Sequence, residues 1–296
     1  MEYCKICGNN KLSKTKYFYK TKENIFRKML YKLPLDYLRK SAKIYNLNSI
    51  IRLKEIIFNR ETFSGNKLYC SSCKTGWHSP VISEEKLDNY YKSFYWLHRS
   101  NKEKIYDFKD KIKPDNLRLN YVRDQYSFIK TNCIQFKSVI DFGAGDCSGG
   151  YFFKKILNKK DVSIFDPSDS ARKLAKIYDL KIIEKLPINK VDLIYSSHSI
   201  EHISDIKKTL KSIKDALNDK GYIFLETPNI SSEEVFLNLI HTPHTYMFSI
   251  DSFKNIAINY GFKIIGIKSS GPLWNKDFKS LKDSSRADLR ICMQKL

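Results

Sequence analysis

Two pairs of closely spaced cysteines lie in the first quarter of the 296-residue sequence. Cys4 and Cys7 form one C-x-x-C pair, and Cys70 and Cys73 form the other. The two-residue spacer lets both thiolates of a pair bind one ion, and Gly8 allows the first turn to close. A redox C-x-x-C fits less well, because it is expected once, at a strand-to-helix turn. The sequence therefore predicts a tetrahedral structural zinc site at Cys4, Cys7, Cys70 and Cys73.

A second group of residues could hold an adenosine-containing ligand. An apolar run over residues 139–142 leads into Gly143-Ala144-Gly145, where bare backbone can approach a ligand closely. Asp166 ends the next apolar run. A carboxylate there can accept hydrogen bonds from both ribose hydroxyls, and it can also cap the following helix; the two roles are compatible. The spacing predicts one ligand held by the turn and by Asp166.

These residues require a parallel sheet to position them. Short β-branched runs alternate with amphipathic stretches, which is typical of strands covered by helices. The predicted strands are 138–142, 162–166, 180–184, 191–197 and 221–226, with closing strands at 262–268 and 287–294. The predicted helices are 169–178 and 205–217, preceded by helical stretches at 24–60, 84–98 and 115–131. Gly221 and Gly261 follow helical runs, where a left-handed residue is expected.

With these elements in place, the sequence resembles the class I S-adenosylmethionine-dependent methyltransferases from about residue 115 onward. The matching segments are Asp141 before the glycine turn, Asp166-Pro167-Ser168, Val191-Asp192-Leu193-Ile194, and Ser197-His198-Ser199-Ile200-Glu201-His202-Ile203. The cysteine pairs, the aromatic stretch after residue 84 and His241-Thr242-Pro243-His244-Thr245-Tyr246-Met247-Phe248-Ser249 resemble bacterial sugar C-methyltransferases and their relatives. The resemblance implies an α/β fold: a Rossmann-like seven-stranded methyltransferase sheet (111–296) with a small N-terminal zinc-binding and helical domain (1–110).

The resemblance also implies roles for residues around the cofactor. The methionine end of the cofactor would be lined by Asp141, Phe142, Gly143, Ala144 and Gly145. Asp166 would hold the ribose, while Pro167 and Glu184 would flank the adenine. Ser197 and His198 would lie at the cofactor's edge. The third glycine of the family falls at Cys147, which predicts a tighter turn.

Methyl transfer to a hydroxyl or carbon acid also needs a base, and histidine is the natural one near neutral pH. His202 is the first candidate, because the exit of the fourth strand faces the methyl group in this fold. His241 and His244 follow, on the connection after the fifth strand; a structural role stays open for each. His198-x-x-Glu201-His202 also spells an inverted zinc-protease signature, but that motif needs a continuous helix.

Composition limits the other possibilities. The net charge is +21, and residues 1–60 hold 15 Lys and Arg against 4 Asp and Glu. Because most of the basic residues are Lys, the charge fits a solvated surface better than sequence-specific reading of nucleic acid. No run of 18 apolar residues and no signal-peptide layout are present, so a cytoplasmic protein is expected.

The main functional hypothesis is therefore a zinc-containing enzyme that methylates a small molecule or glycan precursor, such as a nucleotide-linked sugar, in polysaccharide biosynthesis. An RNA or tRNA methyltransferase is the first alternative, suggested by zinc and basic charge. Against it, Ser196-Ser197-His198 replaces the Asn/Asp-Pro-Pro-aromatic clamp used on base amines. A non-catalytic binding protein with the same fold is the second alternative.

Overall fold

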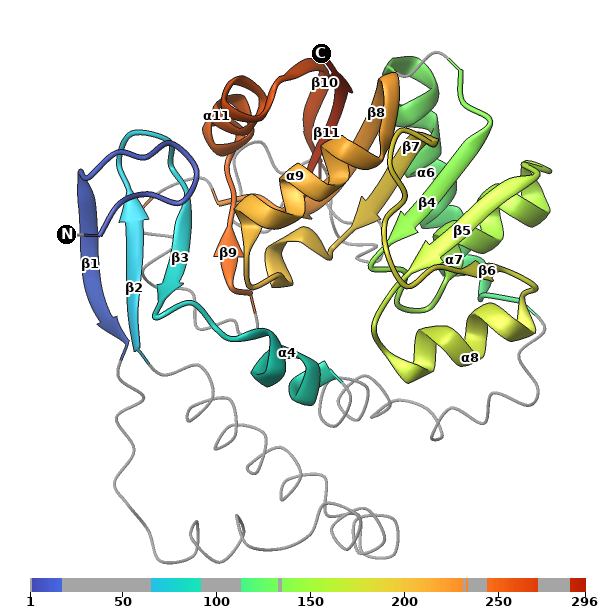
Figure 1. Cartoon of the computed structure of the whole chain (residues 1–296), viewed down its shortest axis with the longest axis horizontal. Coiled ribbons are helices and arrows are strands. Elements are labelled where there is room, and N and C mark those ends of the chain that lie inside the picture. Colours follow the sequence, from blue (N-terminus) through green and yellow to red (C-terminus); the bar gives the residue numbers. More distant parts are fainter. Residues whose placement is uncertain are drawn as a thin grey trace, which may run out of the picture.

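The computed structural model describes residues 2–17, 65–91, 113–132, 135–230, 233, 244–270 and 288–296. The helical stretch predicted at 24–60, His241 and Cys133 lie outside these residues. Two sheets lie side by side: a four-stranded sheet built largely from the amino-terminal region and a larger sheet covered by helices (Figure 1).

The larger sheet has seven strands in the order β10-β11-β8-β7-β4-β5-β6. Its parallel strands are β4 (Ser138–Phe142), β5 (Asp161–Phe165), β6 (Lys181–Ile182), β7 (Val191–Ser197) and β8 (Leu217–Pro228). Two antiparallel neighbours, β10 (Phe262–Ser270) and β11 (Asp288–Lys295), complete the sheet, and β11 lies between β8 and β10. This arrangement confirms the Rossmann-like seven-stranded sheet. Its strand order also brings the carboxyl ends of β4, β5 and β7 together.

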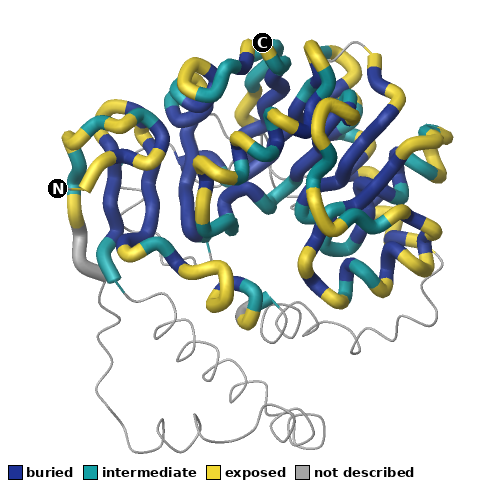
Figure 2. Tube along the Cα trace, in the orientation of Figure 1, coloured by how far each residue is buried: buried dark blue, intermediate teal, exposed yellow. Residues whose placement is uncertain are grey.

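Helices cover both faces of this sheet. Along the chain they are α6 (Asn116–Asn132), α7 (Ser148–Tyr151), the π-helical turn Phe152–Ile156, α8 (Asp169–Ile177), the 3₁₀ turn Ile200–His202, α9 (Ile206–Ala216) and α11 (Ile250–Tyr260). Strand residues alternate between the two cores: Leu193 packs with α6 to α8, whereas Ile194 packs with α9 and α11. The strands of the sheet are consequently buried on both sides (Figure 2).

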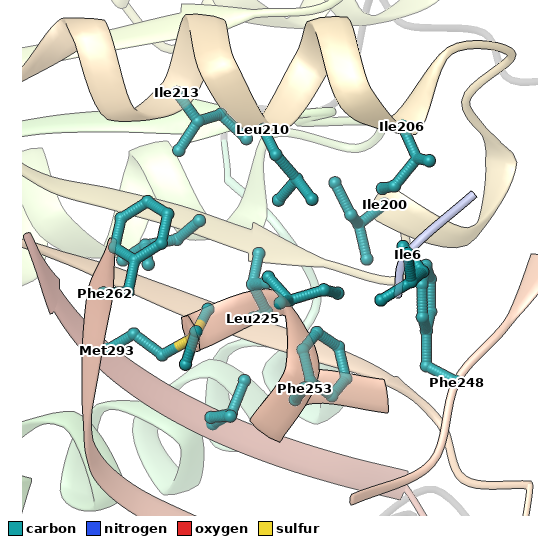
Figure 3. Packing of buried hydrophobic residues seen from close by; sticks show 14 of the residues in the cluster. Ile6, Ile200, Ile206, Leu210, Ile213, Leu225, Phe248, Phe253, Phe262 and Met293 are labelled. Atoms are coloured by element: carbon teal, nitrogen blue, oxygen red, sulfur yellow. The ribbon is translucent and has the colours of Figure 1, made fainter. Parts of the chain in front are cut away.

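The smaller sheet has the order β1-β2-β3-β9 and is antiparallel throughout. It contains β1 (Leu12–Tyr17), β2 (Gly65–Cys70), β3 (Gly76–Ser79) and β9 (Tyr246–Met247), and α4 (Glu84–Tyr90) follows β3. Because β9 comes from the carboxyl-terminal half of the chain, the two sheets share one apolar core. Ile6 belongs to the same cluster as Ile206 and Leu210 of α9 (Figure 3).

Two glycine predictions had different outcomes. Gly261 ends α11 with a φ of +69°, as predicted. The prediction for Gly221 was wrong: Gly221 lies within β8, and Lys220 is the left-handed residue, with φ +60°. Gly221 is instead needed for close packing, because an added Cβ would lie 2.9 Å from the carbonyl oxygen of Asn218 and 3.0 Å from that of Val191.

Other element boundaries differ by small amounts. The strand predicted at 180–184 is only Lys181–Ile182, since β6 is a short edge strand. The strand predicted at 221–226 extends to Leu217–Pro228. In the described part of the chain, no helix has the length and apolar character needed to cross a membrane.

Candidate functional site

One large pocket opens at the carboxyl ends of β4, β5 and β7. Its volume is about 1450 Å³, and α4 and the residues around β9 form the opposite wall. The pocket brings together the cofactor residues predicted from the sequence: Asp141, Phe142, Gly143, Ala144, Gly145, Asp166, Pro167, Glu184, Ser197 and His198. His202, His244 and Tyr91 also line it.

The glycine turn contains three residues with left-handed backbone, at every second position. Gly143 has φ +70°, Gly145 φ +53° and Cys147 φ +59°. An added Cβ at Gly143 would lie 1.8 Å from the hydroxyl of Ser199, so glycine is required there for space as well as conformation. The side chain of Cys147 is fully buried and points to the carbonyl oxygen of Ala171 at 3.3 Å. Cysteine at the family's third glycine therefore leaves the pocket open.

Asp166 organises the turn from the end of β5. One carboxylate oxygen accepts a hydrogen bond from the Gly145 backbone N–H at 2.8 Å. The other accepts from the backbone N–H and the hydroxyl of Ser168, at 2.8 and 2.6 Å. The helix cap predicted for Asp166 belongs to Ser168, whose hydroxyl accepts from the N–H of Ala171. Asp166 thus joins the glycine turn to the start of α8 at the pocket wall.

Asp141 and Glu184 have contrasting surroundings. Burial raises the pKa of Asp141 to about 7, although its carboxylate accepts a hydrogen bond from the Gly150 N–H at 2.7 Å. Glu184 lies at the exposed rim, where Arg172 binds both of its oxygens at 2.6 Å and lowers its pKa. Asp141 therefore lies in the buried wall of the pocket, and Glu184 lies at its exposed edge.

A buried charged network lies beneath the pocket, and sequence analysis missed it. Glu226 of β8 and Arg290 of β11 form an ion pair with both side chains at most 3% exposed. Tyr121 and Gln125 of α6 also donate hydrogen bonds to Glu226. Burial alone raises the pKa of Glu226, but His198 and Arg290 more than offset this and hold it at about 2. The available signal was a charged residue beside apolar ones within a strand: Glu226 directly follows the run 222–225, and Arg290 lies between Leu289 and Ile291.

His198 contacts three carboxylates of this network. Burial lowers its pKa, but contacts with Asp288, Glu201 and Glu226 outweigh burial and raise the pKa well above its usual value. The ring nitrogens lie 3.5 Å from Glu201, 3.5 Å from Glu226 and 3.6 Å from Asp288. His198 therefore lies in the pocket wall and contacts these three carboxylates. The contact with the cofactor that the sequence predicts for His198 stays a prediction.

Two of the three histidines predicted as a general base, His202 and His244, lie side by side in the lining of the pocket. The rings of His202 and His244 have centroids 4.6 Å apart, and Nδ1 of His202 is 2.5 Å from the hydroxyl of Tyr91. Glu201 lies beside them, with an oxygen 3.7 Å from Nε2 of His202. His198 to His202 do not form a continuous helix: His198 has φ +51°, and only a 3₁₀ turn, Ile200–His202, follows it. The inverted zinc-protease geometry is therefore absent at this segment.

The four paired cysteines meet in the smaller sheet. Sγ of Cys4 is 3.4 Å from Sγ of Cys73, and Sγ of Cys7 is 3.6 Å from Sγ of Cys70. All four sulfurs lie within 4.8 Å of one another, close to the separation expected for roughly 2.3 Å zinc–sulfur bonds in a tetrahedron. The two turns close alike, because Gly8 and Lys74 each follow a pair with positive φ, at +73° and +56°.

The chemistry of this cluster also fits a zinc ion. Burial raises the pKa of the Cys7 thiol to about 11, and the hydrogen bond to Cys4 together with burial raises that of Cys73 further. The raised pKa values of Cys7 and Cys73 favour protonated thiols in the absence of a cation, whereas Zn²⁺ would displace the protons and bind four thiolates.

Comparison with known proteins places this geometry in a family. The family model described as "Methyltransferase domain" matches residues 116–266. Two curated relatives are named tRNA U34 carboxymethyltransferase. The protein from Campylobacter jejuni subsp. jejuni is 35% identical over 182 residues, which cover 52% of this chain and 61% of the relative. The protein from Campylobacter curvus is 32% identical over 171 residues, covering 48% of this chain and 56% of the relative. The chain thus spans less than two thirds of either relative's length.

A solved structure, a SAM-dependent methyltransferase from Archaeoglobus fulgidus, has a TM-score of 0.46 and 17% identity; the match covers 68% of this chain and 100% of that one. The family model alone spans more than half of the chain and contains the glycine turn, Asp166 and His202. The chain belongs to the methyltransferase-domain family.

Proposed function

We propose that this enzyme methylates an RNA, with tRNA as the substrate class. The substrate class is proposed because two relatives, 32–35% identical, are named tRNA U34 carboxymethyltransferase. The net charge of +21 supports it, since a basic surface attracts the phosphate backbone. The first hypothesis from the sequence, a nucleotide-linked sugar, thereby becomes the second candidate.

The sugar candidate rests on a separate observation, the charge of the pocket lining. Among the residues that the structure describes, three basic ones line the pocket: Arg118, Lys185 and Lys208. Many more acidic residues do so: Glu84, Asp88, Asp141, Asp146, Asp166, Glu184, Glu201, Asp205, Asp215 and Asp288. Carboxylates suit a hydroxyl-rich acceptor and repel phosphate. For an RNA, this lining means that a nucleoside enters the pocket while its phosphates stay on the basic surface.

A transfer assay separates the two candidates. With S-adenosylmethionine carrying a labelled methyl group, we expect the label to appear in tRNA and not in nucleotide sugars. Binding of tRNA in a gel shift should weaken at least roughly tenfold between 50 and 200 mM salt, because phosphate contacts release counterions. Label found only in the nucleotide-sugar fraction would replace the RNA proposal with the sugar candidate.

The proposed cofactor contacts follow the pocket wall. Gly143, Ala144 and Gly145 present backbone to S-adenosylmethionine, and Asp141 lies beneath its methionine end. The carboxylate of Asp166 accepts from the ribose hydroxyls, with Pro167 and Glu184 beside the adenine. Transfer is an in-line displacement, so the protein has to align the acceptor with the methyl carbon and promote loss of the acceptor's proton. We assign the second task to the side of the pocket that carries His202 and His244; His241 lies outside the described residues.

Replacing Asp166 tests the cofactor assignment. Asp166→Ala is expected to weaken S-adenosylmethionine binding by roughly 10- to 100-fold, because hydrogen bonds to a charged group contribute about 1.5–3 kcal/mol. The variant loses the ribose acceptor and also the anchor of the Gly145 N–H. Isothermal titration calorimetry measures the change. Asp179→Asn, which alters an exposed carboxylate bound to Lys154 and Lys155, is the control and should bind normally. Equal affinity in Asp166→Ala and the wild type would refute the assignment.

The cysteine cluster completes the proposed architecture. We assign one zinc ion to Cys4, Cys7, Cys70 and Cys73, on the grounds of sulfur separation and matching turns. The ion would have a structural role, since four protein ligands leave no coordination position open. The division into a zinc-binding and helical region (1–110) and a methyltransferase domain (111–296) stays a proposal alongside it.

A further inference from the structure

Glu201 is a buried carboxylate without a hydrogen-bond donor. It lies in the 3₁₀ turn after β7 and has 0% exposed surface. Both of its oxygens lack a hydrogen-bond partner within the described part of the chain. Burying a polar group without hydrogen bonds costs free energy, and burying a charge costs far more unless it is paired or binds a metal. A cation bound close to Glu201 would offset this cost, because the histidines His198 and His202 make only long contacts with its carboxylate.

The nearest ionisable groups leave a space between them. Nδ1 of His198 and Nε2 of His202 lie 3.5 and 3.7 Å from Glu201, too far for hydrogen bonds. Glu201, His202 and His244 each offer a ligand atom, and these atoms lie within 4.8 Å of one another. All three residues line the pocket. Metal–ligand bonds of roughly 2.0–2.2 Å place donor atoms about 3–4 Å apart, so a side-chain shift of less than about 1 Å would close the site.

Tyr91, the residue that follows α4, supports this arrangement. Its hydroxyl lies 2.5 Å from Nδ1 of His202. With Nδ1–H donating to the hydroxyl oxygen, Nε2 keeps a lone pair directed to the side where Glu201 lies. A hydrogen bond to the second ring nitrogen is how proteins commonly orient a metal-binding histidine. The acidic lining of the pocket adds a further attraction for a cation.

A neighbouring cluster of similar composition serves as a comparison. His198, Glu226 and Asp288 also lie within 4.8 Å of one another. That cluster already contains a permanent cation, because Arg290 pairs with Glu226. Glu201, in contrast, has two oxygens that accept no hydrogen bond from the described residues. The first cluster is therefore the better candidate for a bound cation.

We infer that Glu201, His202 and His244 bind one divalent cation at the methyltransferase pocket. Two imidazoles and one carboxylate form a nitrogen and oxygen donor set suited to Mn²⁺, Fe²⁺ or Zn²⁺, with coordination positions left open to the pocket. An acceptor oxygen bound to the cation would lose its proton more readily. The proposed methyl transfer requires this loss, so the catalytic role of the cation rests on the proposed function. His202 would then act as a metal ligand and not as a general base.

Manganese is the probe, because its preference for oxygen and nitrogen leaves the cysteine cluster out of the measurement. We expect the zinc-loaded full-length chain to bind one Mn²⁺, detected by the loss of the free-ion signal in electron paramagnetic resonance. Glu201→Gln and His244→Asn should each weaken binding by at least tenfold. The pulsed spectrum should show coupling to imidazole nitrogen, and His244→Asn should reduce that coupling. Two substitutions are used because His244 is partly exposed and tolerates change better than the buried Glu201.

Glu184→Gln is the matched control, since it removes a carboxylate from the rim of the same pocket without touching the cluster. Mn²⁺ affinity should be unchanged in this variant. Absence of Mn²⁺ binding in the wild type, or equal affinity in all variants, would overturn the inference. Titration with S-adenosylmethionine in the absence of Mn²⁺ tests the methyltransferase pocket independently, and tRNA binding tests the proposed substrate, so failure of the metal site is distinguishable from failure of either.

Discussion

Replacing Arg290 with methionine is expected to lower the free energy of unfolding by about 3–5 kcal/mol. Methionine preserves much of the side-chain volume but removes the charge, so the buried Glu226 loses its ion pair with Arg290 and keeps only the longer contact with His198. Asp124 loses its ion pair with Arg290 as well. An uncompensated buried carboxylate is costly, because its attraction to a partner has to offset its lost hydration. Urea unfolding at pH 7, followed by circular dichroism, measures the change.

Arg172→Met provides the matched control. Arg172 also binds both oxygens of a glutamate, Glu184, but this pair is exposed, with side chains 31% and 70% accessible. Solvent screens it, so the loss should be at most about 1 kcal/mol. Similar losses in the two variants would show that burial of the Glu226–Arg290 pair is not what makes it important.

Acid unfolding gives a second readout of the same pair. The pKa of Glu226 is about 2 in the folded state and near its ordinary value of 4.5 in the unfolded state. The stabilisation is therefore complete above about pH 4.5 and is lost as the pH falls towards 2, with a total of roughly 3 kcal/mol. In Glu226→Gln this part of the pH dependence should disappear, which a series of urea titrations between pH 2 and 6 would reveal.

Loss of the proposed zinc ion is expected to destabilise the whole chain. Cys73→Ser should abolish zinc binding and lower the midpoint of thermal unfolding by about 10 °C or more, in a single transition. The physical reason is the shared core: Cys4, Ile6 and Cys73 belong to the same buried cluster as Ile206 of α9. The backbone carbonyl of Cys73 also accepts a hydrogen bond from Ser252 of α11. Elemental analysis and differential scanning calorimetry provide the two measurements.

Cys292→Ala is the control for this substitution, because Cys292 is equally buried but lies on β11 in the other apolar core. It should keep one zinc per chain and lose only the stability associated with a smaller side chain. Wild-type protein that contains no zinc would contradict the metal assignment. A separate low-temperature transition in Cys73→Ser would contradict the shared core.

The sequence predicted most of the sheet, since local signals were strong there. Strands β4 and β7 begin and end at the predicted residues, and α6 to α9 differ little from prediction where a prediction was made. The predicted strand ends were less accurate for the short strand β6 and the irregular strand β8, because the ends of such strands depend on pairing with neighbouring strands. Gly221 shows the same limit: its role comes from atoms of Val191, which is distant in the chain.

What the sequence by itself determined is the order of the elements, the glycine turn with Asp166, and the four cysteines able to meet at one ion. Hydrophobic period, turn residues and fixed spacing carry that information locally. Only the tertiary structure decided which charges meet. Glu226 and Arg290 are 64 residues apart in the chain, and they pair because β11 lies beside β8. In the same way, folding places Tyr91 and His244 beside His202 and leaves Glu201 buried without a donor, since contacts between distant segments depend on strand order and packing.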